Sequence, residues 1–170
     1  AIVMSAGTGG TSATLGRYMR YCSHATELVV VDPENSVFYD SYQSGDRTLT
    51  RDCSSRIEEI GRPKVEPSFQ HDVIDRMIRV PDAASVAAML WLERLTGRRA
   101  GPSTGTNIWG TLQVAQEMRA AGQCGSIVTL MCDSGQRYLD TYYHPAWVGE
   151  KVGDVAPWLD QLGSIGPLPG

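Results

Sequence analysis

A glycine-rich turn between an apolar run and a helical segment constrains this chain more than any other feature. The run Ile2–Ala6 has the composition of a strand buried on both faces, and it leads directly into Gly7-Thr8-Gly9-Gly10-Thr11. The residues that follow, to about Tyr21, carry apolar side chains at helical spacing. Because the amino end of a helix presents unpaired N–H groups and a partial positive charge, this turn predicts an anion site, with phosphate as the natural ligand.

The rest of the chain alternates short apolar runs with amphipathic segments. Strands are expected at 2–6, 27–31, 73–80 and 127–131, and helices at 11–21, 82–96 and 107–121. Residues 37–70 are expected to be irregular. This alternation predicts an α/β fold with a mostly parallel sheet flanked by helices. The main unit is expected to cover residues 1–156, followed by a Gly- and Pro-rich tail at 157–170.

A second glycine-rich loop, Gly101-Pro102-Ser103-Thr104-Gly105, precedes the last expected helix. Ligands of open α/β sheets bind beyond the carboxyl ends of the strands, so two such loops at one edge could hold both ends of one compact ligand. A dinucleotide is the competing ligand, because Gly7 and Gly9 fit the G-x-G-x-x-G pattern and Asp32 ends the next strand. That pattern is incomplete, since Ser12 stands at its third glycine position.

Composition excludes several classes of function. Hydrophobic residues make up 42% of the 170 and charged residues 20%, as in a soluble globular protein. The net charge of -4 argues against nucleic acid or an anionic membrane as main partner. No signal peptide is visible, and no apolar run approaches the ~20 residues of a membrane helix. The four cysteines and three histidines are scattered, which predicts no metal site and reduced thiols in a cytoplasmic protein.

Five segments, in order along residues 6–148, resemble the cysteine synthase and cystathionine β-synthase family of pyridoxal-phosphate (PLP) enzymes, the tryptophan synthase β-like fold type II. They are Gly7–Thr11, Val31–Ser36, Ile57–Gly61, Gly101–Asn107 and Asp133–Tyr138. Within the family, the L-cysteine desulfhydrase branch from actinobacteria looks most similar, on the residues Arg62-Pro63, Gly105–Gly110 and the surroundings of Trp147. The resemblance therefore implies the larger, phosphate-binding part of such an enzyme.

The resemblance also implies roles for residues. Gly7, Thr8, Gly9, Gly10 and Thr11 would hold the phosphate of pyridoxal 5'-phosphate, and Ser103 would hydrogen-bond the pyridine nitrogen. A neutral hydroxyl at the ring nitrogen suits β-elimination through an aminoacrylate, which favours a desulfhydrase acting on L-cysteine. Cysteine synthase activity on O-acetylserine and sulfide is the alternative. Glu59, where the family usually has glycine, could repel a substrate carboxylate or point outward.

The lysine that the family uses to hold its cofactor belongs to an N-terminal half, which would precede residue 1. Only Lys64 and Lys151 are present, and neither stands in the family's lysine motif. We therefore expect the intact protein to be an enzyme and this chain alone to be inactive. Its expected partners are the missing half and a second copy in a homodimer. A dinucleotide-binding module and a non-catalytic binding protein stay open as alternatives.

Overall fold

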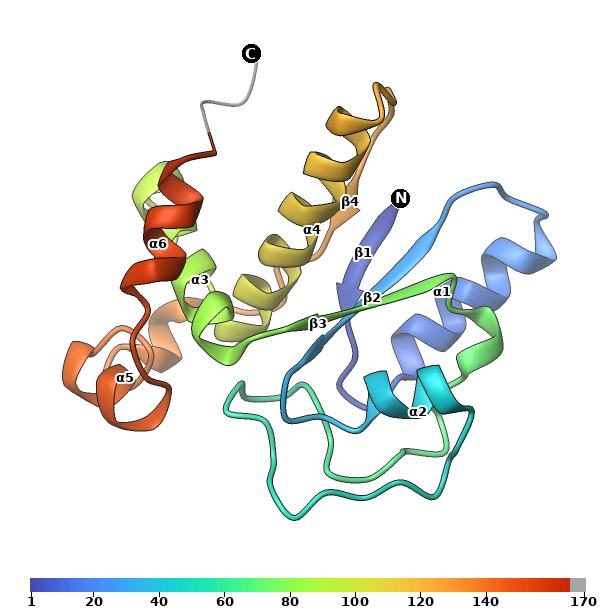
Figure 1. Ribbon diagram of the computed structural model, residues 1–170, viewed down its shortest axis with the longest axis horizontal. Coiled ribbons are helices and arrows are strands. Elements are labelled where there is room, and N and C mark those ends of the chain that lie inside the picture. Colours follow the sequence, from blue (N-terminus) through green and yellow to red (C-terminus); the bar gives the residue numbers. More distant parts are fainter. Residues whose placement is uncertain (166–170) are drawn as a thin grey trace.

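A single parallel sheet forms the centre of the protein. The structure, a computed structural model, describes residues 1–165. All neighbouring strands run parallel, in the order β3-β2-β1-β4, as Figure 1 shows. The strands are β1 (Ile2–Ser5), β2 (Leu28–Pro33), β3 (Arg76–Val80) and β4 (Val128–Thr129). The predicted mostly parallel sheet flanked by helices is therefore confirmed.

Helices cover both faces of this sheet (Figure 1). Helices α1 and α2 lie on one side, and α3, α4 and α6 lie on the other. Short 3-10 turns at His71–Val73 (η1) and Gly135–Tyr138 (η2) complete the regular structure. The helices are α1 (Gly10–Tyr21), α2 (Phe38–Ser44), α3 (Asp82–Thr96), α4 (Pro102–Ala120), α5 (Pro145–Lys151) and α6 (Ala156–Gly163).

Successive side chains of the central strands point to opposite faces of the sheet, so each strand contributes to two hydrophobic cores. Val3 and Val29 point into the cluster beneath α3, α4 and α6, whereas Met4 and Val30 point into the cluster beneath α1 and α2. All six residues of β2 are buried, as expected of a strand covered on both faces. The uncharged apolar runs of the sequence are thus a direct consequence of this layered arrangement.

Helices α3 and α4 pack unusually closely because glycine stands at their contact. A Cβ atom on Gly105 would lie 2.0 Å from the carbonyl oxygen of Ser85 in α3. The Thr106 hydroxyl donates to the Ser85 hydroxyl over 2.8 Å in the same buried contact. The absence of a side chain at Gly105 therefore fixes how the first turns of α4 sit against α3.

The structure corrects the predicted start of the last long helix. α4 begins at Pro102, five residues before the predicted residue 107. Proline is favoured in the first helical turn, where its missing N–H is not needed, and Gly105 serves helix packing rather than a turn. Ser103 consequently lies within the first turn of a helix and not in a preceding loop.

Other elements differ in extent from the predictions. β3 begins at Arg76 because η1 occupies the start of the predicted strand, and β4 has only two residues. α2 forms within the segment expected to be irregular. α6 forms where a tail was expected, and its Leu162 is 1% exposed in the core. The predicted tail beyond Ile165 lies outside the described residues.

Candidate functional site

A cavity of about 370 Å³ opens where β1 ends and α1 begins. All six residues predicted to bind a ligand contribute to its lining: Gly7, Thr8, Gly9, Gly10, Thr11 and Ser103. The structure thus brings the two glycine-rich segments, which are about a hundred residues apart in the sequence, together beyond the carboxyl end of β1, although helices α1 and α4 cover opposite faces of the sheet. The remaining walls include Glu59, Ile60, Arg62, Leu130 and Cys132.

Six successive backbone N–H groups at this cavity lack a protein acceptor. The N–H groups of residues 7–12 donate to no backbone or side-chain acceptor within residues 1–165, and the first bond of α1 runs from the N–H of Ala13 to the carbonyl of Gly9 over 2.9 Å. Gly9 has a φ of 87°, in the left-handed region that glycine tolerates without strain. Consecutive unpaired N–H groups at the positive end of a helix form a concave site for an anion.

Two other segments hold the shape of the turn. The Ser68 hydroxyl donates to the carbonyl of Thr8 over 2.6 Å, and the N–H of Gly61 donates to the carbonyl of Ala6 over 3.2 Å. A Cβ atom on Gly7 would lie 2.8 Å from the carbonyl oxygen of Glu59. Because these contacts use carbonyl groups of the turn, its N–H groups are left free to face a ligand.

Ser103 differs from its neighbours in having an uncommitted hydroxyl. Thr104 accepts a hydrogen bond from the N–H of Cys132 over 3.0 Å, and Thr106 bonds to α3. Asn107 accepts from the N–H of Ser5 over 2.6 Å. Ser103 is 2% exposed and lines the cavity, and its hydroxyl makes no hydrogen bond to the described residues. A buried hydroxyl of this kind is available to a ligand.

Asn107 fastens this helical turn to the sheet. Besides accepting from Ser5 in β1, its side-chain amide donates to the carbonyl of Leu130 over 3.0 Å, beyond the end of β4. The asparagine therefore joins two segments that both border the cavity. Its place in the resembling Gly101–Asn107 motif is explained by this structural role.

Glu59 lies at the rim with its charge paired. Its carboxylate is 3.2 Å from the guanidinium of Arg137 in η2. Its φ of 70° is left-handed, which explains why glycine is the ordinary residue at the resembling position. Of the two expectations for this side chain, the ion pair with the exposed Arg137 supports the outward orientation.

The Asp133–Tyr138 segment forms a supporting network rather than a wall of the cavity. The Tyr138 hydroxyl donates to Asp133 over 2.7 Å, and burial, followed by this hydrogen bond, raises the pKa of Tyr138. The N–H of Gly101 donates to the carbonyl of Asp133 over 3.1 Å, just before α4. These bonds set the start of α4, and so the place of Ser103.

Asp32 does not reach the cavity. Its side chain is fully buried at the end of β2, where it accepts a hydrogen bond from the N–H of Tyr39 over 2.9 Å. Burial raises the pKa of Asp32 to about 7. A carboxylate that caps α2 from the interior cannot hydrogen-bond the ribose of a dinucleotide, so the main support for that alternative is lost.

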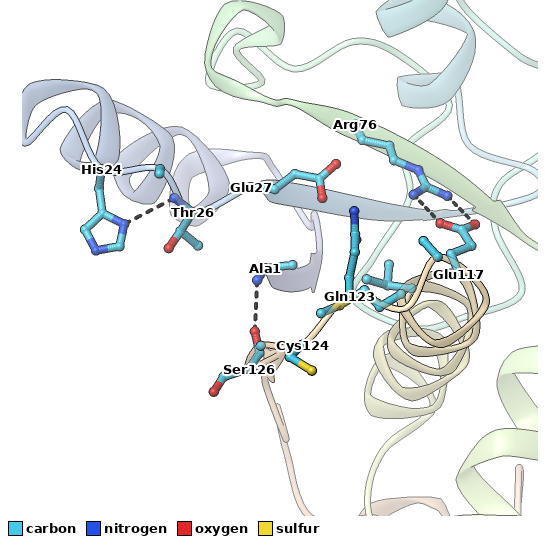
Figure 2. A pocket seen from close by; sticks show the side chains of 14 residues that line it. Ala1, His24, Thr26, Glu27, Arg76, Glu117, Gln123, Cys124 and Ser126 are labelled. Atoms are coloured by element: carbon cyan, nitrogen blue, oxygen red, sulfur yellow. Dashed lines mark hydrogen bonds and ion pairs between the residues drawn. The ribbon is translucent and has the colours of Figure 1, made fainter.

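A larger hollow, of about 600 Å³, lies at the opposite end of the sheet, where the strands begin (Figure 2). Figure 2 shows Ala1, Glu27 and Arg76 around it, with Arg76 bonded by both terminal nitrogens to Glu117 at 2.5 and 2.6 Å. Sheets of this kind bind ligands at the carboxyl ends of their strands, and the arginine here already has a carboxylate partner. The smaller cavity is therefore the better candidate.

Comparison with known proteins identifies a family of enzymes. The family of pyridoxal-phosphate dependent enzymes matches residues 1–133 of the chain, which include the glycine-rich turn and the start of α4. The chain belongs to this family. The predicted cofactor of the family, pyridoxal 5'-phosphate, and the predicted relationship to cysteine synthases are confirmed.

Two relatives show which enzymes of the family the chain is similar to. The chain is 57% identical over 155 residues to the L-cysteine desulfhydrase of Mycobacterium tuberculosis, covering 91% of this chain and 42% of that protein. It is 27% identical to cysteine synthase 1 of Neurospora crassa, covering 89% and 40%. The chain thus spans less than half the length of these relatives.

The crystal structure of an O-ureido-L-serine synthase shares the fold, with a TM-score of 0.69 at 22% identity. The alignment covers 94% of this chain and 46% of that one. This similarity supports the fold type II architecture and, at that level of identity, nothing finer.

Arg62 and Cys132 also line the cavity, although neither was predicted from the sequence to bind a ligand. From the sequence, Arg62 was only a feature of one family branch, and Cys132 was only a reduced thiol. Both stand directly beside resembling motifs, Arg62 after Ile57–Gly61 and Cys132 before Asp133–Tyr138. Their adjacency to those motifs is the signal that could have identified them.

Membrane-spanning helices and metal clusters are both missing from the described part of the chain. Within residues 1–165, no helix is long and apolar enough to cross a membrane. Over the same range, no group of three or more His, Cys, Asp or Glu side chains is arranged to hold a metal ion.

Proposed function

We propose that this chain is the phosphate-binding part of a PLP enzyme that degrades L-cysteine by β-elimination. The observation that carries the proposal is one cavity lined by six unpaired N–H groups, from Gly7 to Ser12, and by the unpaired Ser103 hydroxyl. The N–H groups fit a phosphate, and the hydroxyl fits a single hydrogen bond to a ring nitrogen. These features support pyridoxal 5'-phosphate as the ligand.

The roles of the chain's own residues follow from that arrangement. When bound, PLP supplies an electron sink for cleavage of bonds at the α and β carbons of an amino acid. The turn Gly7–Ser12 would anchor the phosphate. Ser103 would orient the ring through its nitrogen, and a neutral hydroxyl does not stabilise a proton there as a carboxylate would. Hydrogen bonds of Asn107 and Thr104 keep this serine in position.

Proton transfer requires an amine that the cavity lacks. Neither Lys64 nor Lys151 lines it. The lysine of the intact enzyme is therefore proposed to come from a part of the protein outside this chain. Exposed apolar side chains in and just after the edge strand β4, with Val128 56% and Met131 53% exposed, support a contact there with another part of the protein or a second copy. A cytoplasmic homodimer is the assembly we propose.

L-Cysteine is the substrate best supported. In the proposed reaction the C–S bond of cysteine breaks, and one water molecule then hydrolyses the C–N bond of the released imine, so that cysteine and water give hydrogen sulfide, pyruvate and ammonia. The 57% identity to an L-cysteine desulfhydrase supports elimination over synthesis. Synthesis of cysteine from O-acetylserine and sulfide is the second candidate, favoured by the similarity to cysteine synthases.

A substitution of Ser103 tests this assignment in the full-length gene product. Ser103→Ala should lower hydrogen sulfide release from L-cysteine while leaving the melting temperature unchanged, because the hydroxyl bonds to no described residue. Loss of one hydrogen bond corresponds to about 0.5–1.5 kcal/mol, and a misplaced ring adds to the effect. The visible absorbance of the bound cofactor and the rate with O-acetylserine plus sulfide would be measured in parallel.

Thr104→Ala is the matched control. It removes the acceptor of the Cys132 N–H, so it should lower the melting temperature and change the cofactor spectrum less than Ser103→Ala does. Equal sulfide release by Ser103→Ala and the wild type would refute the role given to Ser103. Faster cysteine synthesis than desulfhydration by the wild type would favour the second candidate.

A further inference from the structure

Arg62 is a half-buried arginine without a carboxylate partner. Three arginines within residues 1–165 are half-buried: Arg51, Arg62 and Arg76. Arg51 lies 2.6 Å from Asp40, and Arg76 lies 2.5 Å from Glu117. The side chain of Arg62 forms no ion pair or hydrogen bond with the described residues, and its Nε is buried and unsatisfied.

The backbone around Arg62 is firmly held. Its N–H donates to the Ser36 hydroxyl over 3.2 Å, and its carbonyl accepts from the N–H of Val37 over 2.9 Å. The preceding residue, Gly61, bonds to Ala6 at the entrance of the glycine-rich turn. The unpaired guanidinium is therefore attached to a fixed backbone, and Arg62 lines the same cavity as the turn and Ser103.

A buried donor on a permanently charged group is costly unless an acceptor meets it. No carboxylate within residues 1–165 serves Arg62, and Glu59, which also lines the cavity, is paired with Arg137. The N–H groups of residues 7–12 carry no net charge, so Arg62 is the cation available to an anionic ligand there. The terminal nitrogens of Arg62 also lack a partner among the described residues and, unlike Nε, are not buried, so an oxyanion in the cavity could accept from them and from the N–H groups of residues 7–12.

We infer that Arg62 binds an oxyanion of the ligand in this cavity. Two sources share this chemistry: the phosphate of the cofactor and the carboxylate of the amino-acid substrate. The inference rests on the proposed function, and it adds a charged binding residue to a site that otherwise consists of neutral donors.

The test compares Arg62→Met and Arg62→Lys with the wild type in the full-length gene product. One arm titrates cofactor-free protein with PLP and measures its dissociation constant. The other arm measures KM and kcat for L-cysteine at saturating PLP. Arg51→Met is the matched control, because Arg51 is also half-buried but lies outside the cavity. Melting temperatures show whether each variant is folded, and Arg62→Lys retains the charge if Arg62→Met does not fold.

A phosphate role predicts a roughly tenfold or greater rise in the PLP dissociation constant of Arg62→Met, about 1.4 kcal/mol, with KM little changed. A carboxylate role predicts the reverse pattern, a roughly tenfold rise in KM with unchanged PLP binding. In either case Arg62→Lys should fall between Arg62→Met and the wild type, and Arg51→Met should match the wild type in both arms.

Unchanged PLP binding and unchanged KM in a folded Arg62 variant would overturn the inference. The proposed function fails separately, if the wild type itself binds no PLP or releases no sulfide from L-cysteine.

Discussion

Substitution of Gly105 by alanine tests the helix contact that positions the candidate site. An alanine Cβ at this position would lie 2.0 Å from the Ser85 carbonyl oxygen and 3.0 Å from the Cβ of Met89. Alanine gains about 1 kcal/mol in helix propensity over glycine. Overpacking typically costs about 1–3 kcal/mol, and the upper end applies because the nearest atom belongs to the backbone of α3 and cannot rotate away. We expect Gly105→Ala to lower the free energy of unfolding by about 2 kcal/mol.

Denaturant unfolding followed by circular dichroism would measure this change. Gly149→Ala is the control, because Gly149 lies in helix α5 and a Cβ atom added there would have no neighbouring atom within 4 Å. The same exchange there should raise stability by about 0.5–1 kcal/mol. Since Gly105 lies within one helical turn of Ser103, its variant should also retain less cofactor. A Gly105→Ala protein as stable as the wild type would refute the close packing of α3 on α4.

Two further predictions concern buried polar groups. Burial raises the pKa of Asp32 to about 7 from 3.8, so the folded protein holds this proton more tightly than the unfolded chain, and the free energy of unfolding should fall as the pH rises from 4 to 7. Asp32→Asn should reduce that fall, which a series of melting temperatures at different pH values would measure. Asp82, with a pKa raised to about 6, should preserve part of this loss of stability in the variant. An unaltered pH profile in Asp32→Asn would contradict the raised pKa of Asp32. Asn107→Ala should lower the free energy of unfolding by roughly 2–4 kcal/mol, because it leaves the Ser5 N–H and the Leu130 carbonyl without partners. A loss below about 0.5 kcal/mol is within the range of ordinary surface substitutions and would show that Asn107 does not join these segments.

The sheet was predictable because its strands obey a local rule. Val29, Val30 and Val31 form an uncharged β-branched run, which is what a strand covered on both faces requires. The glycine-rich turn was predictable for a similar reason, since Gly9 must adopt a left-handed backbone at the start of a helix. Both inferences use only neighbouring residues, and both agree with the structure.

Features that depend on distant contacts were not predictable in this way. Gly105 resembles a turn residue in sequence, but its function depends on the approach of Ser85, twenty residues earlier in the chain. Arg62 has no local signal of burial, because its surroundings come from Ser36 and from the turn near Ala6. α6 was missed because its proline and glycine content suggested a tail, although Trp158 and Leu162 have helical spacing.

The most direct test of the central claim is a crystal structure of the full-length gene product with pyridoxal 5'-phosphate. We predict that the phosphate oxygens lie within about 2.7–3.2 Å of several N–H groups of residues 7–12. The ring nitrogen should lie at hydrogen-bond distance from the Ser103 hydroxyl. A phosphate bound elsewhere, with those N–H groups facing only solvent, would contradict the assignment of this cavity as the cofactor site.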